Sequence, residues 1–269
     1  MRYLYYPGCS LKCTARGYEE SLLAVFSALG CTLEEIQDWN CCGATAYMSV
    51  DEMKAFALAA RNLALAEGHG DLEPSVTVVA PCSACYLVLT KAHRYMQEYG
   101  EVGQTIRRAL SKAGLEYQGR VVIRHPLDIL VNDIGLEKIG QVLQNRFRSL
   151  KVASYYGCQM IRPWATFDEQ YNPCSMDHLV QTVGGLPVEW SLKTRCCGGS
   201  LTGTVEEVGL RLCHILLKEA ERQGAELIVT SCPLCQFNLE CFQDQIHRRF
   251  NGGVYLPVIY FTQLLGAAL

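Results

Sequence analysis

Short runs of β-branched and aromatic residues recur along the chain, separated by longer segments with a helical repeat. Runs of this kind predict buried strands, because Val, Ile and Tyr suit a pleated surface that is packed on both faces. The predicted strands span residues 2–6, 32–36, 75–80 and 120–124 in the first half, and 151–156, 186–190, 226–230 and 254–259 in the second.

Apolar residues spaced three or four positions apart fill the intervening segments and predict helices. Leu22 and Leu29 mark one such apolar face, which ends at Gly30. Asp51 suits the N-cap of the next helix, and Gly68 suits its end. The predicted helices span residues 17–29, 50–67, 82–99, 101–113, 127–130, 176–183, 205–223 and 232–250, with a short closing helix after the last strand.

Strands that alternate with helices predict α/β domains with parallel sheets, Rossmann-like in their order of elements. Ligands of such sheets bind beyond the carboxyl ends of the strands. Cys9, Cys82, Cys158 and Cys232 each follow a predicted strand closely. We therefore expect the cysteines of each half to gather at one edge of its sheet.

The cysteines follow one pattern that occurs twice. A lone cysteine precedes a Cys-Cys-Gly tripeptide, and a Cys-x-x-Cys motif follows it. This repeat predicts two similar domains, residues 1–147 and residues 148–269. The repeated cysteines are Cys9, Cys41, Cys42, Cys82 and Cys85 in the first half, and Cys158, Cys196, Cys197, Cys232 and Cys235 in the second.

A net charge of −3, with 49% apolar and 19% charged residues, describes an ordinary globular protein. This charge gives no reason to expect nucleic acid or an anionic membrane surface as a partner. We see neither a signal peptide nor an apolar run of the roughly 18 residues needed to span a bilayer. We therefore expect a cytoplasmic protein with reduced thiols, in which dense cysteines indicate metal or redox chemistry rather than disulfides.

The number of cysteines discriminates among metals. Thiolates select zinc, copper(I) or iron–sulfur clusters, and a structural zinc or a standard cluster takes four ligands, whereas each half offers five. Adjacent cysteines diverge and suit two different irons or a bridging role, and the glycine after them lets the backbone approach an inorganic core. We infer five ligands per cluster and an unusual cluster geometry. Structural zinc and a thioredoxin-type dithiol explain less of the pattern.

The five remaining cysteines are interpreted as non-ligands. Cys31 and Cys213 suit small buried apolar positions. Cys13 is close enough to Cys9 to be a thiol beside the ligands. Cys174 and Cys241 complete the set of fifteen.

Few other side chains suggest chemistry. His125 and His178 are candidate proton sources by residue type, although a hydrogen-bonded structural role is the better interpretation. Four cations near the predicted sheet edges could anchor an anionic substrate, although a surface salt bridge is the better interpretation of each. These cations are Arg124, Arg162, Lys193 and Arg195.

Specific words flank the cysteines: Tyr-Pro-Gly-Cys at 6–9, Tyr-Gly-Cys-Gln-Met-Ile-Arg-Pro at 156–163, Asn-Pro-Cys-Ser-Met-Asp at 172–177, Lys-Thr-Arg-Cys-Cys-Gly-Gly at 193–199 and Pro-Val-Ile-Tyr-Phe-Thr-Gln-Leu-Leu-Gly at 257–266. Together with the two cysteine patterns, these words resemble the HdrB-like family, the B subunits of heterodisulfide reductase, with its duplicated cysteine-rich CCG domain. The resemblance covers essentially the whole chain.

This resemblance implies two non-cubane [4Fe-4S] clusters that face one another across a pseudo-twofold axis, with the coenzyme M–coenzyme B disulfide of methanogens cleaved between them. Carried over by motif, the ligands of the two clusters are the two quintets of cysteines given above. Two electrons reduce one disulfide, so two equivalent clusters could each deliver one. Related subunits occur in bacteria that make neither coenzyme, so the family leaves open which small disulfide or thiol is the substrate.

Absent motifs indicate that the electrons come from elsewhere. The chain has no ferredoxin cysteine run, no dinucleotide-binding glycine motif and no P-loop, so we expect it to bind neither flavin nor nicotinamide. The expected partners are a ferredoxin-like iron–sulfur subunit (HdrC-like) and a flavin subunit (HdrA-like). Two alternatives stay open: a CCG-domain electron relay, lactate- or glycolate-oxidase-like or quinone-linked, and a zinc-stapled assembly protein.

Overall fold

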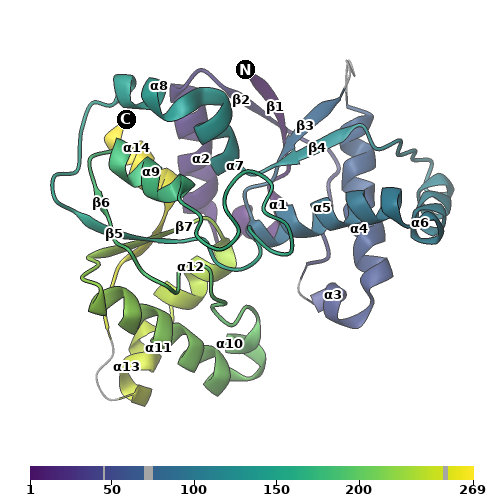
Figure 1. Cartoon of the computed structure of the whole chain (residues 1–269). Helices are drawn as coiled ribbons and strands as arrows, with labels where there is room; N and C mark the ends of the chain where they lie inside the picture. Colours follow the sequence, from purple (N-terminus) through teal and green to yellow (C-terminus); the bar gives the residue numbers. More distant parts are fainter. Residues whose placement is uncertain (45, 70–74, 251–253) are drawn as a thin grey trace. The chain divides into compact units, whose positions relative to one another are not determined.

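A computed structural model describes every residue except 45, 70–74 and 251–253. The chain divides into two compact units (Figure 1). The first unit comprises Met1–Glu19 and Gly30–Pro126, and the second comprises Glu20–Leu29 and Leu127–Leu269.

The first unit is built on a four-stranded sheet with the order β2-β1-β3-β4, parallel throughout. Val78 in the third strand pairs with Leu4 on one side and Ile123 on the other, so the two central strands lie side by side. The strands are β1 (Arg2–Tyr5), β2 (Thr32–Glu35), β3 (Val76–Val79) and β4 (Val121–Arg124). All four agree with the predicted runs to within about a residue or two.

The second unit repeats this topology, with the order β6-β5-β7-β8 and parallel pairing throughout. Its strands are β5 (Lys151–Tyr155), β6 (Leu186–Pro187), β7 (Leu227–Thr230) and β8 (Val258–Tyr260). The prediction of two similar parallel α/β folds is therefore confirmed.

The last strand begins later than the predicted residue 254. The backbone of Leu256 is held by a side chain instead of a neighbouring strand: its N–H donates to Gln243 Oε1 at 3.0 Å, and its carbonyl accepts from Gln243 Nε2 at 2.7 Å. Pro257 has no N–H to donate. The hydrogen bonds to β7 therefore begin at the Pro257 carbonyl, which accepts from the Ile228 N–H at 2.9 Å, and the strand itself begins at Val258.

Helices of the first unit pack against its sheet (Figure 1), and both α4 and α5 contribute buried apolar residues to its core. Asp51 caps α4 as predicted, because its carboxylate accepts from the backbone N–H of Lys54 at 3.1 Å. Two short helices, α1 and α3, were not predicted. The helices are α1 (Gly8–Leu11), α3 (Ala46–Val50), α4 (Glu52–Glu67), α5 (Ser83–Glu98) and α6 (Gly100–Lys112).

The second unit differs from the prediction at four helices. Helices α8 (Leu136–Val142) and α10 (Leu201–Thr204) were not predicted, and two predicted helices have other bounds. The predicted helix 232–250 is two helices, α12 (Pro233–Glu240) and α13 (Gln243–Phe250). The side-chain amide of Gln243 donates to the Leu239 carbonyl at 2.8 Å, at the place where a continuous helix would use a backbone N–H. The predicted helix 127–130 is longer than expected, because it runs on through a π-helical turn. The other helical segments are α7 (Pro126–Asp128), η1 (Ile129–Gly135), α8 (Leu136–Val142), α9 (Ser175–Thr182), α10 (Leu201–Thr204), α11 (Glu206–Arg222) and α14 (Phe261–Ala268).

One helix of the N-terminal half contributes to the second unit. Helix α2 (Arg16–Ala28) has residues from Glu20 onward in that unit. There the hydroxyls of Ser21 and Thr262 lie 2.7 Å apart. Membership of the second unit is therefore not continuous along the sequence.

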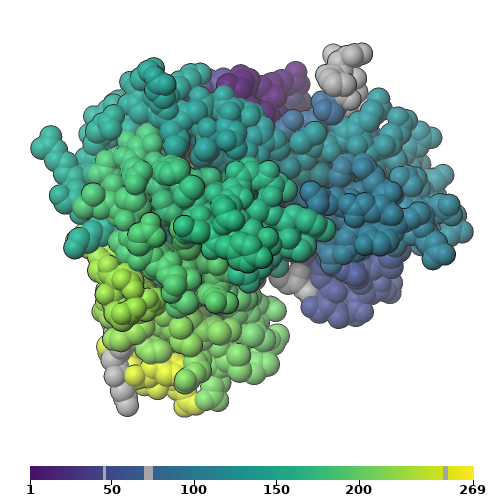
Figure 2. Space-filling model, viewed as in Figure 1, coloured from purple at the N-terminus to yellow at the C-terminus, as the bar shows by residue number. Residues whose placement is uncertain are grey.

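Paired tyrosines at the ends of the first strands anchor each core. Tyr5 and Tyr6 of the first unit, and Tyr155 and Tyr156 of the second, are fully buried. Figure 2 shows the atoms that cover these elements, seen from the same side. None of the described helices combines the length and the apolar character that crossing a membrane requires.

Candidate functional site

The order of strands predisposes one edge of each sheet to bind a ligand. In the first unit the chain leaves β1 toward β2 on one side, then returns to β3 on the other side of β1. Loops that diverge from neighbouring strands in this way leave a crevice at the carboxyl edge. Cys9 follows β1 and Cys82 follows β3, so these cysteines flank that point. Cys158 and Cys232 have the same positions after β5 and β7.

The structure brings together the five predicted cysteines of the first half. Cys42 Sγ lies 3.2 Å from Cys85 Sγ. The side chains of Cys9 and Cys41 are hydrogen-bonded to each other, as are those of Cys41 and Cys42 and those of Cys82 and Cys85. The five sulfurs therefore form one continuous chain of contacts, which we call the first cysteine group. Cys9 and Cys41 are exposed and the other three are buried, so the group has an open side.

The second half forms the same chain of contacts in the same order. Cys197 Sγ lies 3.6 Å from Cys235 Sγ. The side chains of Cys158 and Cys196 are hydrogen-bonded to each other, as are those of Cys196 and Cys197 and those of Cys232 and Cys235. In this second cysteine group, Cys196 is exposed and Cys158 half-buried, whereas the remaining three are buried. Equivalent cysteines thus occupy equivalent places in the two units.

The thiols of each group perturb one another's ionisation. In the second group, hydrogen bonds from Cys158 and Cys197 lower the pKa of Cys196 to about 2, and the bond to Cys196 raises the pKa of Cys197 to about 11. In the first group, bonds from Cys41 and Cys85 lower the pKa of Cys42, while the bond to Cys42 raises that of Cys85. Neighbouring thiolates repel one another. Full ionisation of either group therefore requires a positively charged species that compensates the sulfurs.

A glycine leaves space beside the sulfurs in each group. A Cβ built on Gly8 would lie 3.1 Å from Cys85 Sγ, and one built on Gly157 would lie 3.1 Å from Cys235 Sγ. Both glycines have positive φ, +69° and +68°. The all-sulfur donor sets and the close backbone approach fit a thiolate-bound metal cofactor. Within the described part of the chain, no three Cys, His, Asp or Glu side chains surround a point suited to a single metal ion.

The glycine after each cysteine pair also packs closely against a helix. A Cβ on Gly43 would lie 3.0 Å from Ala55 Cα in α4, and one on Gly198 would lie 3.3 Å from Gly209 Cα in α11. These glycines therefore let the Cys-Cys-Gly turn pack directly on the following helix.

The residues interpreted as structural behave largely as expected. His125 is buried, with Nε2 3.0 Å from the carbonyl oxygen of Pro81, whereas His178 is exposed. Cys31 and Cys213 are buried, and Cys213 Sγ donates to the Cys197 carbonyl at 3.3 Å. Cys13 is exposed.

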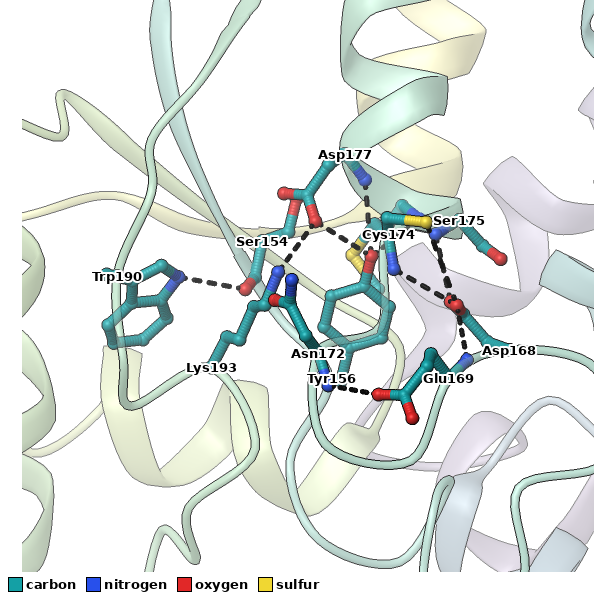
Figure 3. Close-up of polar contacts among 11 residues, drawn as sticks. Ser154, Tyr156, Asp168, Glu169, Asn172, Cys174, Ser175, Asp177, Trp190 and Lys193 are labelled. Carbon is teal, nitrogen blue, oxygen red and sulfur yellow. Dashed lines mark hydrogen bonds and ion pairs between the residues drawn. The ribbon is translucent and has the colours of Figure 1, made fainter.

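Lys193 corrects one expectation from the sequence. Its ion pair is present, with Nζ 3.3 Å from Asp177 Oδ2, but both side chains are buried rather than at the surface (Figure 3). Tyr156 donates its hydroxyl proton to Asp177 Oδ2 at 3.1 Å and accepts from the Met176 N–H at 2.8 Å. Burial raises the pKa of Asp177 despite the neighbouring ammonium. Lys193 is thus committed to an internal pair.

This network connects two of the three segments that carry ligand candidates of the second group, those of Cys158 and of Cys196-Cys197. The carbonyl of Lys193 accepts from the N–H groups of Tyr156 and Gly157, at 2.9 and 3.1 Å, just ahead of Cys158. Asp177 and Tyr156 were not singled out from the sequence, although both belong to the words that flank the cysteines. Arg162 is exposed, and its charge contributes to the low pKa of Cys196.

The family model described as the cysteine-rich domain CCG matches this chain twice, over residues 3–90 and 152–240. Each match contains one complete cysteine group.

Relatives of similar length align with almost the whole chain. The 8-methylmenaquinol:fumarate reductase membrane anchor subunit of Wolinella succinogenes is 30% identical, over 99% of this chain and 92% of its own. A protein of Archaeoglobus profundus that is named as similar to the B subunit of heterodisulfide reductase is 27% identical, over 100% of this chain and 91% of its own. The B subunit of the ferredoxin/F420H2-dependent CoB-CoM heterodisulfide reductase of Methanosarcina acetivorans is 28% identical, over 98% of this chain and 88% of its own.

A solved structure shares the fold. The crystal structure of a hypothetical protein from Helicobacter pylori superposes with a TM-score of 0.74 at 14% identity, and the match covers 99% of this chain. It covers 48% of that protein, so the present chain spans about half of its length.

Proposed function

This chain belongs to the family of cysteine-rich CCG domain proteins, and on that premise we propose that it is the iron–sulfur catalytic subunit of a heterodisulfide reductase-like complex. The two equivalent chains of five sulfurs carry the proposal. Relatives named for the B subunit of heterodisulfide reductase, aligned over nearly their full lengths, support it. Each CCG domain, residues 1–147 and 148–269, would contribute one site.

The proposed cofactors are two non-cubane [4Fe-4S] clusters, each held by one cysteine group. When bound, such clusters supply electrons one at a time, and a disulfide takes up two electrons and two protons to give two thiols. The protein's own part is to hold five sulfurs per cluster and to keep three of them buried. The exposed cysteines of the two groups, Cys9 and Cys41 in the first and Cys196 in the second, would leave room for a small disulfide or thiol.

The proposed setting is a cytoplasmic multi-subunit complex. The relative in Methanosarcina mazei is named as the B subunit of a ferredoxin:CoB-CoM heterodisulfide reductase, 28% identical over 97% of this chain. By analogy, we propose a ferredoxin-like iron–sulfur subunit and a flavin subunit as electron donors.

A relay function is the second candidate. The Wolinella succinogenes relative is named as a subunit of an 8-methylmenaquinol:fumarate reductase and is 30% identical. It favours a quinone-linked complex in which the clusters only pass electrons on. A substrate thiol then has no reason to bind at either cysteine group.

Anaerobically purified protein tests both candidates. We expect about eight irons and eight sulfides per chain from two four-iron clusters, and an EPR spectrum that changes when a small thiol is added to the oxidised protein. Cys42→Ala and Cys197→Ala should each cost one cluster and abolish disulfide reduction. A thiol-insensitive spectrum would favour the relay. Zinc without iron would overturn both candidates and establish a zinc-stapled protein.

A further inference from the structure

Each Cys-Cys-Gly turn is held by one buried asparagine, but the two asparagines come from different helices. Asn62 of α4 holds the turn in the first unit, and Asn238 of α12 holds it in the second. Both side chains are essentially inaccessible to solvent. An amide buried this deeply is kept only where its hydrogen bonds are made.

Neither asparagine has a counterpart in the other unit. Asn238 comes three positions after Cys235, and the residue three positions after Cys85 is Val88. Asn62 comes seven positions after Ala55, which packs on Gly43, and the residue seven positions after Gly209 is Leu216. Val88 and Leu216 are both buried. The buried amide therefore comes from non-equivalent helices of the two units. It lies on the helix that packs on the Cys-Cys-Gly turn in the first unit and on the helix of the Cys-x-x-Cys motif in the second.

The two amides bind different parts of the turn. Asn62 grips the backbone ahead of the cysteine pair: its Oδ1 accepts from the Asn40 N–H at 2.8 Å, and its Nδ2 donates to the Asn40 carbonyl at 2.9 Å. Asn238 grips the pair itself. Its Nδ2 lies 2.8 Å from the Gly199 carbonyl, 3.4 Å from the Cys197 carbonyl and 3.4 Å from Cys197 Sγ.

Thr202 fixes the direction of the Asn238 amide. The Thr202 hydroxyl donates to Asn238 Oδ1 at 2.8 Å, so the oxygen is engaged and the NH₂ group must face the turn. The two protons of this NH₂ group then face three acceptors. The nearest acceptor is the Gly199 carbonyl, which takes one of the protons. The second proton is left between the carbonyl and the sulfur of Cys197.

A hydrogen bond to a ligand sulfur draws electron density from it, which favours the more negative, reduced state of a cluster and raises its reduction potential. We propose that Asn238 is a positioning residue that raises the potential of the cluster at the second cysteine group. This inference rests on the proposed function. The hydrogen bond from Asn238 would make the reduction potentials of the two sites unequal, because the apolar Val88 occupies the matching position in the first unit. An electron that reaches the chain is then held preferentially by the second site.

Redox titration of the whole cluster-loaded chain, followed by EPR, tests this inference. Asn238→Val supplies the residue that the first unit already tolerates at this place. We expect full iron content and one midpoint potential shifted to a more negative value, with the other unchanged. Val88→Ala, the matched control, should leave the potential that responds to Asn238 where it is.

Thr202→Val is the second variant. It keeps the amide but removes the hydroxyl that orients it, so we expect a smaller shift of the same potential in the same direction. If Asn238→Val loses iron, this variant decides the outcome alone. Retained iron with both potentials unmoved overturns the inference and leaves the proposed function intact. Wild-type protein without iron overturns both.

Discussion

At the scale of single residues, the glycine ahead of each first ligand candidate has two separable properties. A Cβ at Gly8 would combine a positive φ with a position 3.1 Å from Cys85 Sγ, whereas a Cβ at Gly30, which has a similar φ of +73°, would meet no atom within 4 Å. Backbone strain for a non-glycine residue in this region is about 1–2 kcal/mol. The two positions therefore separate strain from contact with a sulfur.

We expect Gly8→Ala to reduce bound iron to about half, because a methyl group displaces one sulfur of the first cysteine group and costs one of two clusters. Gly30→Ala should lower the free energy of unfolding by about 1 kcal/mol, because its backbone strain is similar to that at Gly8. This variant should still bind the full amount of iron. Iron analysis and denaturant unfolding measure the two effects. Equal iron in the two variants would show that the space beside Cys85 is unimportant.

The buried pair of Lys193 and Asp177 gives a second prediction at this scale. Asp177→Asn leaves the Lys193 ammonium buried without a counter-charge, and breaking a buried pair in this way costs about 3–5 kcal/mol. Lys193→Met leaves a buried carboxylate whose pKa burial already raises. The double variant removes both charges, so its loss of stability should be clearly smaller than the sum of the single losses.

Denaturant unfolding of the four proteins measures this coupling. The exposed pair of Lys218 and Glu221, 3.3 Å apart in the same unit, provides a control: Glu221→Gln should cost less than about 1 kcal/mol. Strictly additive losses for Asp177 and Lys193 would contradict the role of the pair.

At the scale of elements, helix α5 (Ser83–Glu98) starts at the Cys82 motif and contains a histidine that responds to pH. His93 lies with Nδ1 2.5 Å from the Tyr117 hydroxyl and Nε2 3.3 Å from Gln97. Burial, aided by the charge of Arg94 and opposed by that of Glu67, lowers the pKa of His93 below its usual 6.5. The folded chain therefore takes up this proton less readily than the unfolded chain does.

It follows that His93 favours folding above pH 6.5, and that this contribution is lost as the pH falls through 6.5 toward the lower pKa of the folded state. His93→Gln should flatten the fall in unfolding free energy over this window, by less than the limit of about 1.4 kcal/mol per pH unit that one proton sets. His178→Gln, a change of the same kind at an exposed position, is the control. Identical pH slopes for wild type and His93→Gln would refute the prediction.

At the scale of the whole molecule, one topology occurs twice with different supporting side chains. The two sheets have the same strand order. In each, the lone first cysteine follows one central strand and the Cys-x-x-Cys motif follows the other. The supporting residues diverge: Asn62 and Asn238 come from different helices, and the pair of Lys193 and Asp177 belongs to the second unit. A repeated framework can thus present equivalent cysteines in unequal surroundings.

The sequence by itself determined the repeat, the parallel α/β class, most element positions and the ten cysteines that gather in two separate groups of five. These features depend on near-neighbour signals: residue periodicity, the Asp51 cap and cysteines placed directly after strands. That these cysteines bind iron stays a prediction.

Only the tertiary structure decided which side chains support the cysteines and where some elements end. Glu20–Leu29 joins the second unit, Gln243 delays the last strand, and Asn238 reaches Cys197 across 41 positions of sequence. The physical reason is that each of these outcomes depends on a hydrogen bond or packing contact between segments far apart in the chain. A local pattern of apolar and polar residues does not identify such a partner, because the path of the folded backbone decides which distant residues come into contact.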